Sequence, residues 1–198
     1  MPVAPVAVAQ NSLALDFLCQ HLRPEKKYNI LDLGAAWPEN ISFFSKYTSK
    51  LYVEDLYQTL GPQISDIQNG GAGEKPADSG DLLSYQGDTS FNLIFAWDLF
   101  NYLKREELQQ FIQELSKICT RRAFIFAFIS TRAQIPQHPQ AYKILDQKSI
   151  LCDGVDSKVE RTHPRYREAE LLKIMPGFKV FKSFLLRNGM QEYLFSYQ

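Results

Sequence analysis

Two acidic residues that follow a glycine at a set spacing are the first candidates for chemistry in this chain of 198 residues. Residues 29–33 form a short apolar run typical of a buried parallel strand, and Gly34 ends it as a residue that turns easily because it lacks a Cβ atom. Residues 51–53 resume a strand that stops at Glu54 and Asp55, about 20 residues after the glycine. A carboxylate at this place can accept hydrogen bonds from ribose hydroxyls. We therefore expect a nucleotide-type site here, and the alternative is an ordinary solvated or helix-capping carboxylate.

Three more residues near predicted strand ends could serve a site. Asp32 lies inside the apolar run, where a carboxylate that accepts hydrogen bonds from loop amides is favoured over a catalytic one. Trp97 follows a predicted strand on the side of the sheet where ligands bind in α/β folds, with ordinary packing as the alternative. Asp98 comes next, as a substrate contact or as the N-cap of the following helix. The sequence identifies no catalytic acid or base.

Charge and cysteine content argue against several classes of function. Lys plus Arg and Asp plus Glu each number 22, so the formal net charge is zero. Nucleic acid is therefore not the expected partner, because phosphate binding usually needs a basic excess, although a local patch is compatible with a neutral total. Cys19, Cys119 and Cys152 lack the spacing of a disulfide framework or a zinc site, and no histidine pair has metal-ligand spacing. We expect no metal site and a reducing, cytoplasmic location.

The first ten residues, MPVAPVAVAQ, do not have the pattern of a targeting segment. They contain two prolines and no basic residue, which does not fit a signal peptide, and no later stretch has the length of a membrane span. We expect a loose N-terminal arm and no membrane partner.

Strand and helix patterns alternate along most of the chain. We expect helices at about 12–21, from Pro38, at 104–119 and at 168–175. Strands are expected at 29–33, 51–53, 81–85, 92–96 and 121–130, followed by two strands joined at Asn188 and Gly189. Residues 61–80 are expected to be mostly loop. The alternation predicts a parallel sheet, whereas the last pair must be antiparallel because a tight turn joins it.

One polar segment with several prolines, residues 131–167, interrupts this alternation. Asp153 and Gly154 are a hairpin turn signal flanked by residues 149–152 and 157–161. We expect one domain over residues 1–198 with a β-hairpin insertion at about 131–167.

Several motifs, taken in order, resemble the class I S-adenosylmethionine-dependent methyltransferases over about residues 11–197. ILDLGAA (30–36) resembles the family's first motif, and VEDL (53–56) resembles the second, an acidic residue that ends the next strand. FNLIFAWDLFNYL (91–103) is similar to the strand-four segment, and LLKIMPGFKV (171–180) is similar to the last helix with its P-G-F exit. The resemblance implies an α/β, three-layer Rossmann-like fold with a mostly parallel seven-stranded sheet and an antiparallel C-terminal strand.

The resemblance also implies S-adenosyl-L-methionine as cofactor and assigns residues to it. Gly34 and Ala35 would contact the methionine portion, and Asp55, in preference to Glu54, would accept both ribose hydroxyls. Asp81 would contact the adenine amine. The cofactor-binding residues implied are Asp32, Gly34, Ala35, Ala36, Glu54, Asp55, Asp81, Leu82, Ala96 and Trp97.

The acceptor implied is a small molecule of unknown identity. Asp98 would contact it, since residues 96–98 would lie beside the transferred methyl group. Arg165 and Arg167 belong to a basic cluster around His163, in a segment that often lies over the acceptor site in this fold. They are candidate contacts to an anionic acceptor.

The glycine motif departs from the family's GxGxG, because this chain has Gly34, Ala36 and Pro38. Pro38 also removes an N–H that could meet a carboxylate at a helix start. A second hypothesis is therefore a catalytically inactive methyltransferase-like domain that serves binding or scaffolding. An NAD-type Rossmann enzyme is less favoured, since GAAWPE lacks two of the three glycines of G-x-G-x-x-G. The oligomeric state is open, and a homodimer is compatible with the sequence.

Overall fold

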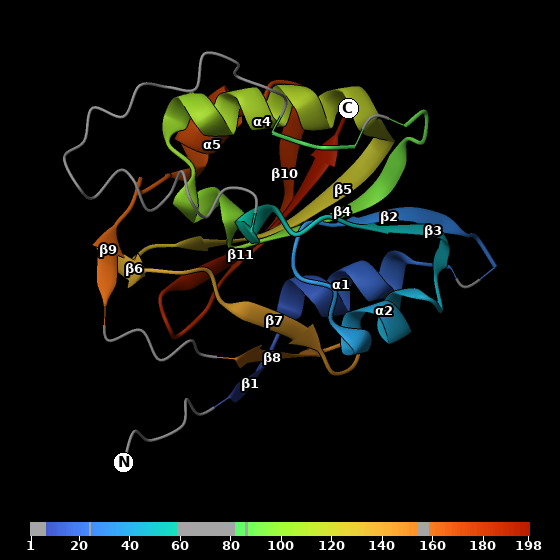
Figure 1. Cartoon of the computed structure of the whole chain (residues 1–198), viewed down its shortest axis with the longest axis horizontal. Helices are drawn as coiled ribbons and strands as arrows, with labels where there is room; N and C mark the ends of the chain where they lie inside the picture. Colours follow the sequence, from blue (N-terminus) through green and yellow to red (C-terminus); the bar gives the residue numbers. More distant parts are fainter. Residues whose placement is uncertain (1–6, 24, 59–81, 86, 154–158) are drawn as a thin grey trace.

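The computed structural model describes residues 7–23, 25–58, 82–85, 87–153 and 159–198, and the fold is built around one six-stranded sheet (Figure 1). The strand order is β10-β11-β5-β4-β2-β3. The strands are β2 (Tyr28–Asp32), β3 (Thr48–Val53), β4 (Phe91–Trp97), β5 (Cys119–Ser130), β10 (Phe178–Leu185) and β11 (Met190–Tyr197). The four strands β3, β2, β4 and β5 are parallel, whereas β11 pairs antiparallel with both β5 and β10. The predicted Rossmann-like α/β architecture is confirmed.

Helices cover both faces of this sheet (Figure 1). The helices α4 (Arg105–Ile118) and α5 (Glu168–Ile174) lie on one face, and α1 (Leu13–His21) and α2 (Pro38–Phe44) lie on the other. A 3-10 helix, η1 (Leu99–Tyr102), follows β4. Their starts follow local signals: the Ser12 side chain accepts a hydrogen bond from the amide of Leu15, and Pro38 holds the first position of α2.

Each face of the sheet carries its own apolar core. Beneath α4, aromatic and aliphatic side chains from β4, β5 and β11 pack with Phe111 and Leu115. On the opposite face, α1 and α2 pack on Phe95 and Phe126. The buried carboxylate of Glu192 on β11 accepts a hydrogen bond of 2.9 Å from the amide of Ala14, in the first turn of α1. This bond links α1 to the sheet. This two-sided burial explains why β4 and β5 are almost continuously apolar.

The predicted hairpin across Asp153 and Gly154 is wrong. The strand β8 (Ser149–Asp153) pairs instead with β7 (Ala141–Ile144) on one side and with β1 (Val8–Asn11) on the other. The strand β9 (Glu160–Thr162) pairs with β6 (Gln134–Pro136). The insertion therefore contains a hairpin, but it is formed by β7 and β8. Residues 154–158 lie outside the described part of the chain.

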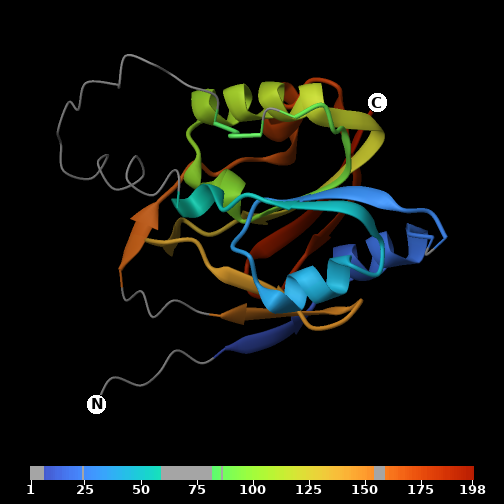
Figure 2. The same cartoon turned by 45° about the vertical axis from the view of Figure 1, so that its right-hand side comes forward.

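The β1–β8–β7 sheet covers the face of the molecule that carries α1 and α2 (Figure 2). Tyr142, Ile144 and Ile150 from its inner side join the core beneath those helices. Because residues 8–11 form β1, the prediction of a loose arm is wrong for this part of the N-terminus; residues 1–6 are outside the described ranges.

A strand was predicted at residues 81–85, but residues 82–85, which the structure describes, are not in a strand. Among the described residues the main sheet has six strands, whereas seven were predicted. The amide of Leu83 donates to Glu114 on α4 at 2.9 Å. This side-chain bond takes the donor that a sheet ladder would need. The loop predicted at 61–80 lies outside the described residues. No helix within the described ranges is long and apolar enough to cross a membrane.

Candidate functional site

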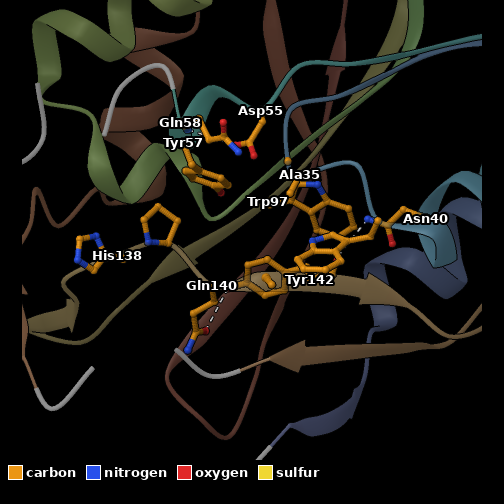
Figure 3. Close-up of a pocket in the computed structure, with 13 residues that line it drawn as sticks. Ala35, Asn40, Asp55, Tyr57, Gln58, Trp97, His138, Gln140 and Tyr142 are labelled. Atoms are coloured by element: carbon orange, nitrogen blue, oxygen red, sulfur yellow. Dashed lines mark hydrogen bonds between the residues drawn. The ribbon is translucent and has the colours of Figure 1, made fainter. Parts of the chain in front are cut away.

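A pocket of about 280 Å³ lies where the parallel strands β2, β3 and β4 end (Figure 3). Its lining comes from the turn after β2, the start of the segment after β3, the last residue of β4 and the insertion at residues 138–142. The lining residues are Gly34, Ala35, Trp37, Asn40, Asp55, Tyr57, Gln58, Trp97, His138, Pro139, Gln140, Ala141 and Tyr142. The carboxyl ends of parallel strands are where α/β sheets bind ligands.

Gly34 and Trp97 line this pocket, and both donate hydrogen bonds to the buried Asp32, which does not line it. The indole Nε1 of Trp97 donates to Asp32 Oδ1 at 2.6 Å, and the Gly34 amide donates to the same oxygen at 3.1 Å. Burial raises the pKa of the Asp32 carboxyl to about 6, against the opposing effect of its hydrogen bonds from Trp97, Gly34 and Asn40. Asp32 therefore bonds a loop amide, as predicted, but its shortest bond is to a tryptophan 65 residues away.

Trp97 is held in a backbone conformation that side chains rarely adopt, with φ of +48°. Its ring lies against Gly34, because a Cβ atom at position 34 would be 2.9 Å from two of the ring atoms. On its other side the indole stacks on Tyr142, with centroids 5.6 Å apart and planes at 3°. Such strain persists where the surroundings hold it in place, and it gathers at functional sites.

Asn40 on α2 joins the insertion to this end of the sheet through two hydrogen bonds to β7. Its Nδ2 donates to the carbonyl of Tyr142 at 3.0 Å, and its Oδ1 accepts from the amide of Ile144 at 2.8 Å. Asn40 is 1% exposed, so both bonds are made out of water. These two bonds fix the position of β7 beside the pocket, and Tyr142 on β7 lines the pocket.

Of the two acidic residues after β3, Asp55 lies in the pocket lining and Glu54 does not. The carboxylate of Glu54 accepts from the amide of Ser84 at 2.5 Å. Asp55 accepts from the amide of Gln58 at 3.3 Å, which is a helix-start contact. Figure 3 places Asp55 and Ala35 together at one end of the pocket. The geometry therefore favours Asp55 as the carboxylate that a ligand can reach.

Asp98 lies behind the pocket wall rather than in it. It occupies the N-cap position of η1, but its side chain makes no capping bond there. Asp98 Oδ1 instead accepts from the phenol of Tyr57 at 2.5 Å, and Tyr57 lines the pocket. Burial raises the pKa of Asp98 to about 6, and burial together with Asp98 raises the pKa of Tyr57 well above its ordinary value. The pair thus consists of a neutral phenol that lines the pocket and a buried carboxyl whose pKa is raised to about 6.

No family model matches this sequence, and no curated protein matches it. Solved structures do match its fold. A methyltransferase from Clostridium acetobutylicum, described as S-adenosylmethionine-dependent, aligns with a TM-score of 0.54 at 13% identity, over 92% of this chain and 89% of that one. The chain has the methyltransferase fold.

Two further neighbours with this methyltransferase fold were solved with S-adenosylhomocysteine bound. Magnesium protoporphyrin IX methyltransferase from Synechocystis has a TM-score of 0.52 at 12% identity, over 93% of this chain and 80% of that one. The 1,6-didemethyltoxoflavin-N1-methyltransferase from Burkholderia thailandensis, which also holds bound 1,6-didemethyltoxoflavin, has a TM-score of 0.50 at 10% identity, over 93% of this chain and 76% of that one. At these identities the likeness establishes the fold of this chain.

Within the methyltransferase fold, the structure brings together only part of the residue set expected from the sequence. Gly34, Ala35, Asp55 and Trp97 line one pocket. Ala36 is exposed and does not line it, and Ala96 is fully buried in the core beneath α4. Leu82 packs at the edge of that core, also away from the pocket lining. Asp81 lies outside the described residues.

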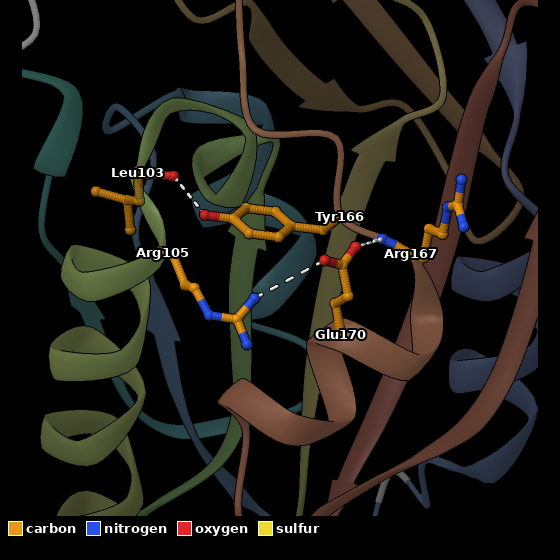
Figure 4. A network of polar contacts seen from close by, with 5 residues as sticks. All are labelled: Leu103, Arg105, Tyr166, Arg167 and Glu170. Atoms are coloured by element: carbon orange, nitrogen blue, oxygen red, sulfur yellow. Dashed lines mark hydrogen bonds and ion pairs between the residues drawn. The ribbon is translucent and has the colours of Figure 1, made fainter.

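Arg165 and Arg167 are not among the residues that line the pocket. Arg165 donates to the carbonyl of Thr131 at 3.2 Å. Arg167 precedes α5, where its amide donates to Glu170 at 3.1 Å, and Glu170 lies 3.8 Å from Arg105 (Figure 4). These contacts place the two arginines in the connection between the insertion and α5. Their predicted role as acceptor contacts gains no support from this pocket.

Several lining residues were not predicted from the sequence. Tyr57, two residues after Asp55, could have been found by extending the strand-end motif along the chain. His138 is exposed and also lines the pocket, with Gln140 and Tyr142. The resemblance implied that the end of the insertion lies over the acceptor site, but no sequence signal singles out residues 138–142. Among the described residues, no group of histidine, cysteine or acidic side chains is arranged to hold a metal ion.

Proposed function

We propose that this chain binds S-adenosyl-L-methionine at the carboxyl ends of β2 and β3 and transfers its methyl group to a small-molecule acceptor. The observation that carries the proposal is the position of Asp55 in one pocket with Gly34 and Ala35, in a chain with the methyltransferase fold. A carboxylate at that strand end suits the two hydroxyls of a ribose. Neighbours with the same fold hold S-adenosylhomocysteine.

The pocket fits one half of the cofactor better than the other. Asp55 fits the ribose, whereas the space directly above Gly34 is filled by the indole of Trp97. The volume of about 280 Å³ is just below the range of about 300–1,000 Å³ usual for ligand pockets. Binding of the methionine half against Gly34 would therefore take place beside the Trp97 indole.

When bound, the cofactor supplies an activated methyl group, so the protein mainly has to position the acceptor and exclude water. Tyr57 can hold the acceptor atom through its phenol. Asp98, whose pKa is raised to about 6 by burial, is a carboxylate above that pH and can take up a proton through the Tyr57 hydroxyl. Trp37, Trp97 and Tyr142 supply apolar wall around the site.

Calorimetry with S-adenosylmethionine, S-adenosylhomocysteine and NAD tests the proposal. We expect both sulfur ligands to bind and NAD not to bind. Asp55→Asn should weaken binding by roughly tenfold to a hundredfold, as expected for a lost hydrogen bond to a charged group, while its side-chain oxygen can still accept from Gln58. Asp88→Asn, at an exposed acidic residue outside the pocket lining, is the matched control and should bind as tightly as wild type. Failure of both sulfur ligands to bind at millimolar concentration would remove the proposal.

The second candidate is a binding or scaffolding domain without methyl transfer, which Trp97 favours because it fills the space above Gly34. A Trp37→Phe variant leaves Trp97 as the single tryptophan of this chain and reports on it by fluorescence. An active methyltransferase should show a change in that emission when S-adenosylhomocysteine binds. Unchanged emission up to millimolar ligand favours the scaffolding domain.

A further inference from the structure

A second pocket, of about 570 Å³, lies at the opposite end of the parallel strands. It is lined by the first residue of β2, the starts of β4 and β5 and the C-terminal end of α1, together with residues of β10 and β11. Because parallel strands share one direction, this amino-end pocket and the site at Asp55 lie at opposite edges of the sheet. None of its lining residues is shared with the first pocket.

The amino-end pocket is strongly basic although the whole chain is neutral. Lys26, Arg121, Arg122 and Lys179 line it, and none of its lining side chains is acidic. Within the described part of the chain, none of these four side chains forms an ion pair. Unpaired positive charges gathered around one concave surface produce a local potential that attracts anions. The zero net charge of the chain therefore conceals a local anion-attracting surface.

Aromatic rings stand among these positive charges. Phe181 on β10 is 38% exposed and lines the pocket. Its ring centroid lies 5.2 Å from that of Phe124 and 5.7 Å from that of Phe17. The Lys182 ammonium lies over the Phe17 ring at 5.1 Å, at the edge of the same cluster. Exposed rings interleaved with cations are typical of surfaces that stack bases and bind phosphates.

The backbone is irregular at the residues that present these groups. The register between β4 and β5 jumps, since Phe91 pairs with Cys119 but Leu93 pairs with Phe124, and the intervening Arg122 has φ of +65°. On β10 the register shifts between Val180 and Lys182, so Phe181 is the extra residue of a bulge. Bulges re-aim side chains and occur next to sites, and a left-handed residue other than glycine carries strain. Two separate irregularities thus turn an arginine and an aromatic ring toward one pocket.

We propose that the amino-end pocket binds nucleotide units. Phosphate groups are held by Lys26, Arg121, Arg122 and Lys179, and a base stacks on Phe181. The required chemistry is an anionic phosphate linked to a flat aromatic ring. A single-stranded RNA and a free mononucleotide both supply it. This site is independent of the proposed methyltransferase function and can be tested without its cofactor.

Two measurements test the two possible ligands. Fluorescence anisotropy with a labelled oligouridylate of about twelve nucleotides tests single-stranded RNA, and calorimetry with uridine monophosphate tests a free nucleotide. If the four cations each neutralise one phosphate, oligomer affinity should fall by about 50-fold between about 50 and about 200 mM salt. Arg121→Gln combined with Arg122→Gln should reduce that salt effect to about sevenfold and weaken binding. Phe181→Ala should weaken binding by about fivefold or more, through the lost stacking.

Two further variants keep the test decisive. Arg121→Gln with Arg122→Gly removes the same two charges but places glycine at the left-handed position, so a folding defect from that backbone does not arise. Lys117→Gln with Lys173→Gln removes two exposed charges from α4 and α5, outside the pocket lining, and is the matched control. Circular dichroism of each variant checks the fold.

Tight, salt-dependent oligomer binding that the pocket variants weaken supports single-stranded RNA as the source. Equal binding of monophosphate and oligomer, weakened by the same variants, supports a free nucleotide. The proposal is overturned if neither probe binds at millimolar concentration, or if the pocket variants weaken binding no more than the control pair does.

Discussion

Replacing Trp97 with phenylalanine removes the indole N–H that donates to Asp32 at 2.6 Å, while an aromatic ring stays beside Gly34. Asp32 is 1% exposed, so water cannot easily take the place of the lost donor. The pKa of this carboxyl is already raised to about 6 by burial, and the Trp97 bond is the largest of the contacts that oppose the rise. The variant should therefore raise that pKa further.

The cost of Trp97→Phe should depend on pH. At about pH 8 Asp32 is ionised, and losing a hydrogen bond to a charged group costs about 1.5–3 kcal/mol. At about pH 5 the carboxyl is mostly protonated in the folded state, and a neutral hydrogen bond is worth about 0.5–1.5 kcal/mol. The loss of packing volume is the same at both pH values. The variant should thus lose about 1–1.5 kcal/mol more stability at the higher pH.

Urea denaturation followed by circular dichroism at both pH values measures this difference. Each kilocalorie corresponds to a change of about 2–4 °C in melting temperature for a chain of this size. Trp37→Phe is the control: Trp37 lines the same pocket, but its ring contact is to the Lys143 ammonium at 4.2 Å, whereas the hydrogen bonds to Asp32 come from Trp97, Gly34 and Asn40. Equal losses at pH 5 and pH 8 for Trp97→Phe would refute the idea that the indole supports an ionised Asp32.

Three other perturbations follow from the same site. Burial raises the pKa of Asp98 from 3.8 to about 6, so the folded state binds more protons than the unfolded state between those values. Wild type should therefore lose about 2 kcal/mol relative to Asp98→Asn as pH rises from about 4 to about 6, measured by denaturation, and a constant difference would contradict this. Asn40→Ala leaves two buried backbone groups of β7 without partners and should cost about 2–4 kcal/mol, with hydrogen exchange showing whether the loss is concentrated in residues 141–153. Gly34→Ala puts a Cβ atom 2.9 Å from the Trp97 ring and should cost about 1–3 kcal/mol by thermal denaturation; a fully stable variant would show that the ring is free to move away.

The elements that could be predicted from the sequence are those whose signal is local. The apolar run of β5 and the one-sided pattern of α4 depend on neighbouring residues, and both elements form as expected. The same holds for the cap at Ser12 and for proline at the start of α2. The carboxylate at the end of β3 was also predictable, because strand ends and glycine turns have a set spacing.

The elements that could not be predicted depend on contacts between distant residues. The residue types of Asp153 and Gly154 favour a turn, but the residues that pair with β8 are far from it in the sequence. β8 pairs with β1, and Asn40 holds its other partner, β7, through two hydrogen bonds. The pairing of Trp97 with Asp32 joins two strand ends 65 residues apart. The basic pocket could not be predicted because its four cations come from separate segments of the chain, and the equal numbers of acidic and basic residues give a net charge of zero.

The pairing of β1 with β8 has a consequence for synthesis of the protein on the ribosome. Val8 pairs with Cys152, so a strand near the start of the chain has no partner until about 140 more residues have been made. The parallel core strands β2 to β5 are complete before that point and can begin to fold first, since chains fold from the N-terminus as they emerge. The wall that holds Tyr142 is added afterwards. A nascent chain therefore passes through a stage in which the strand ends around Asp55 are exposed and a β-strand is unpaired, which is when assistance from a chaperone would matter most.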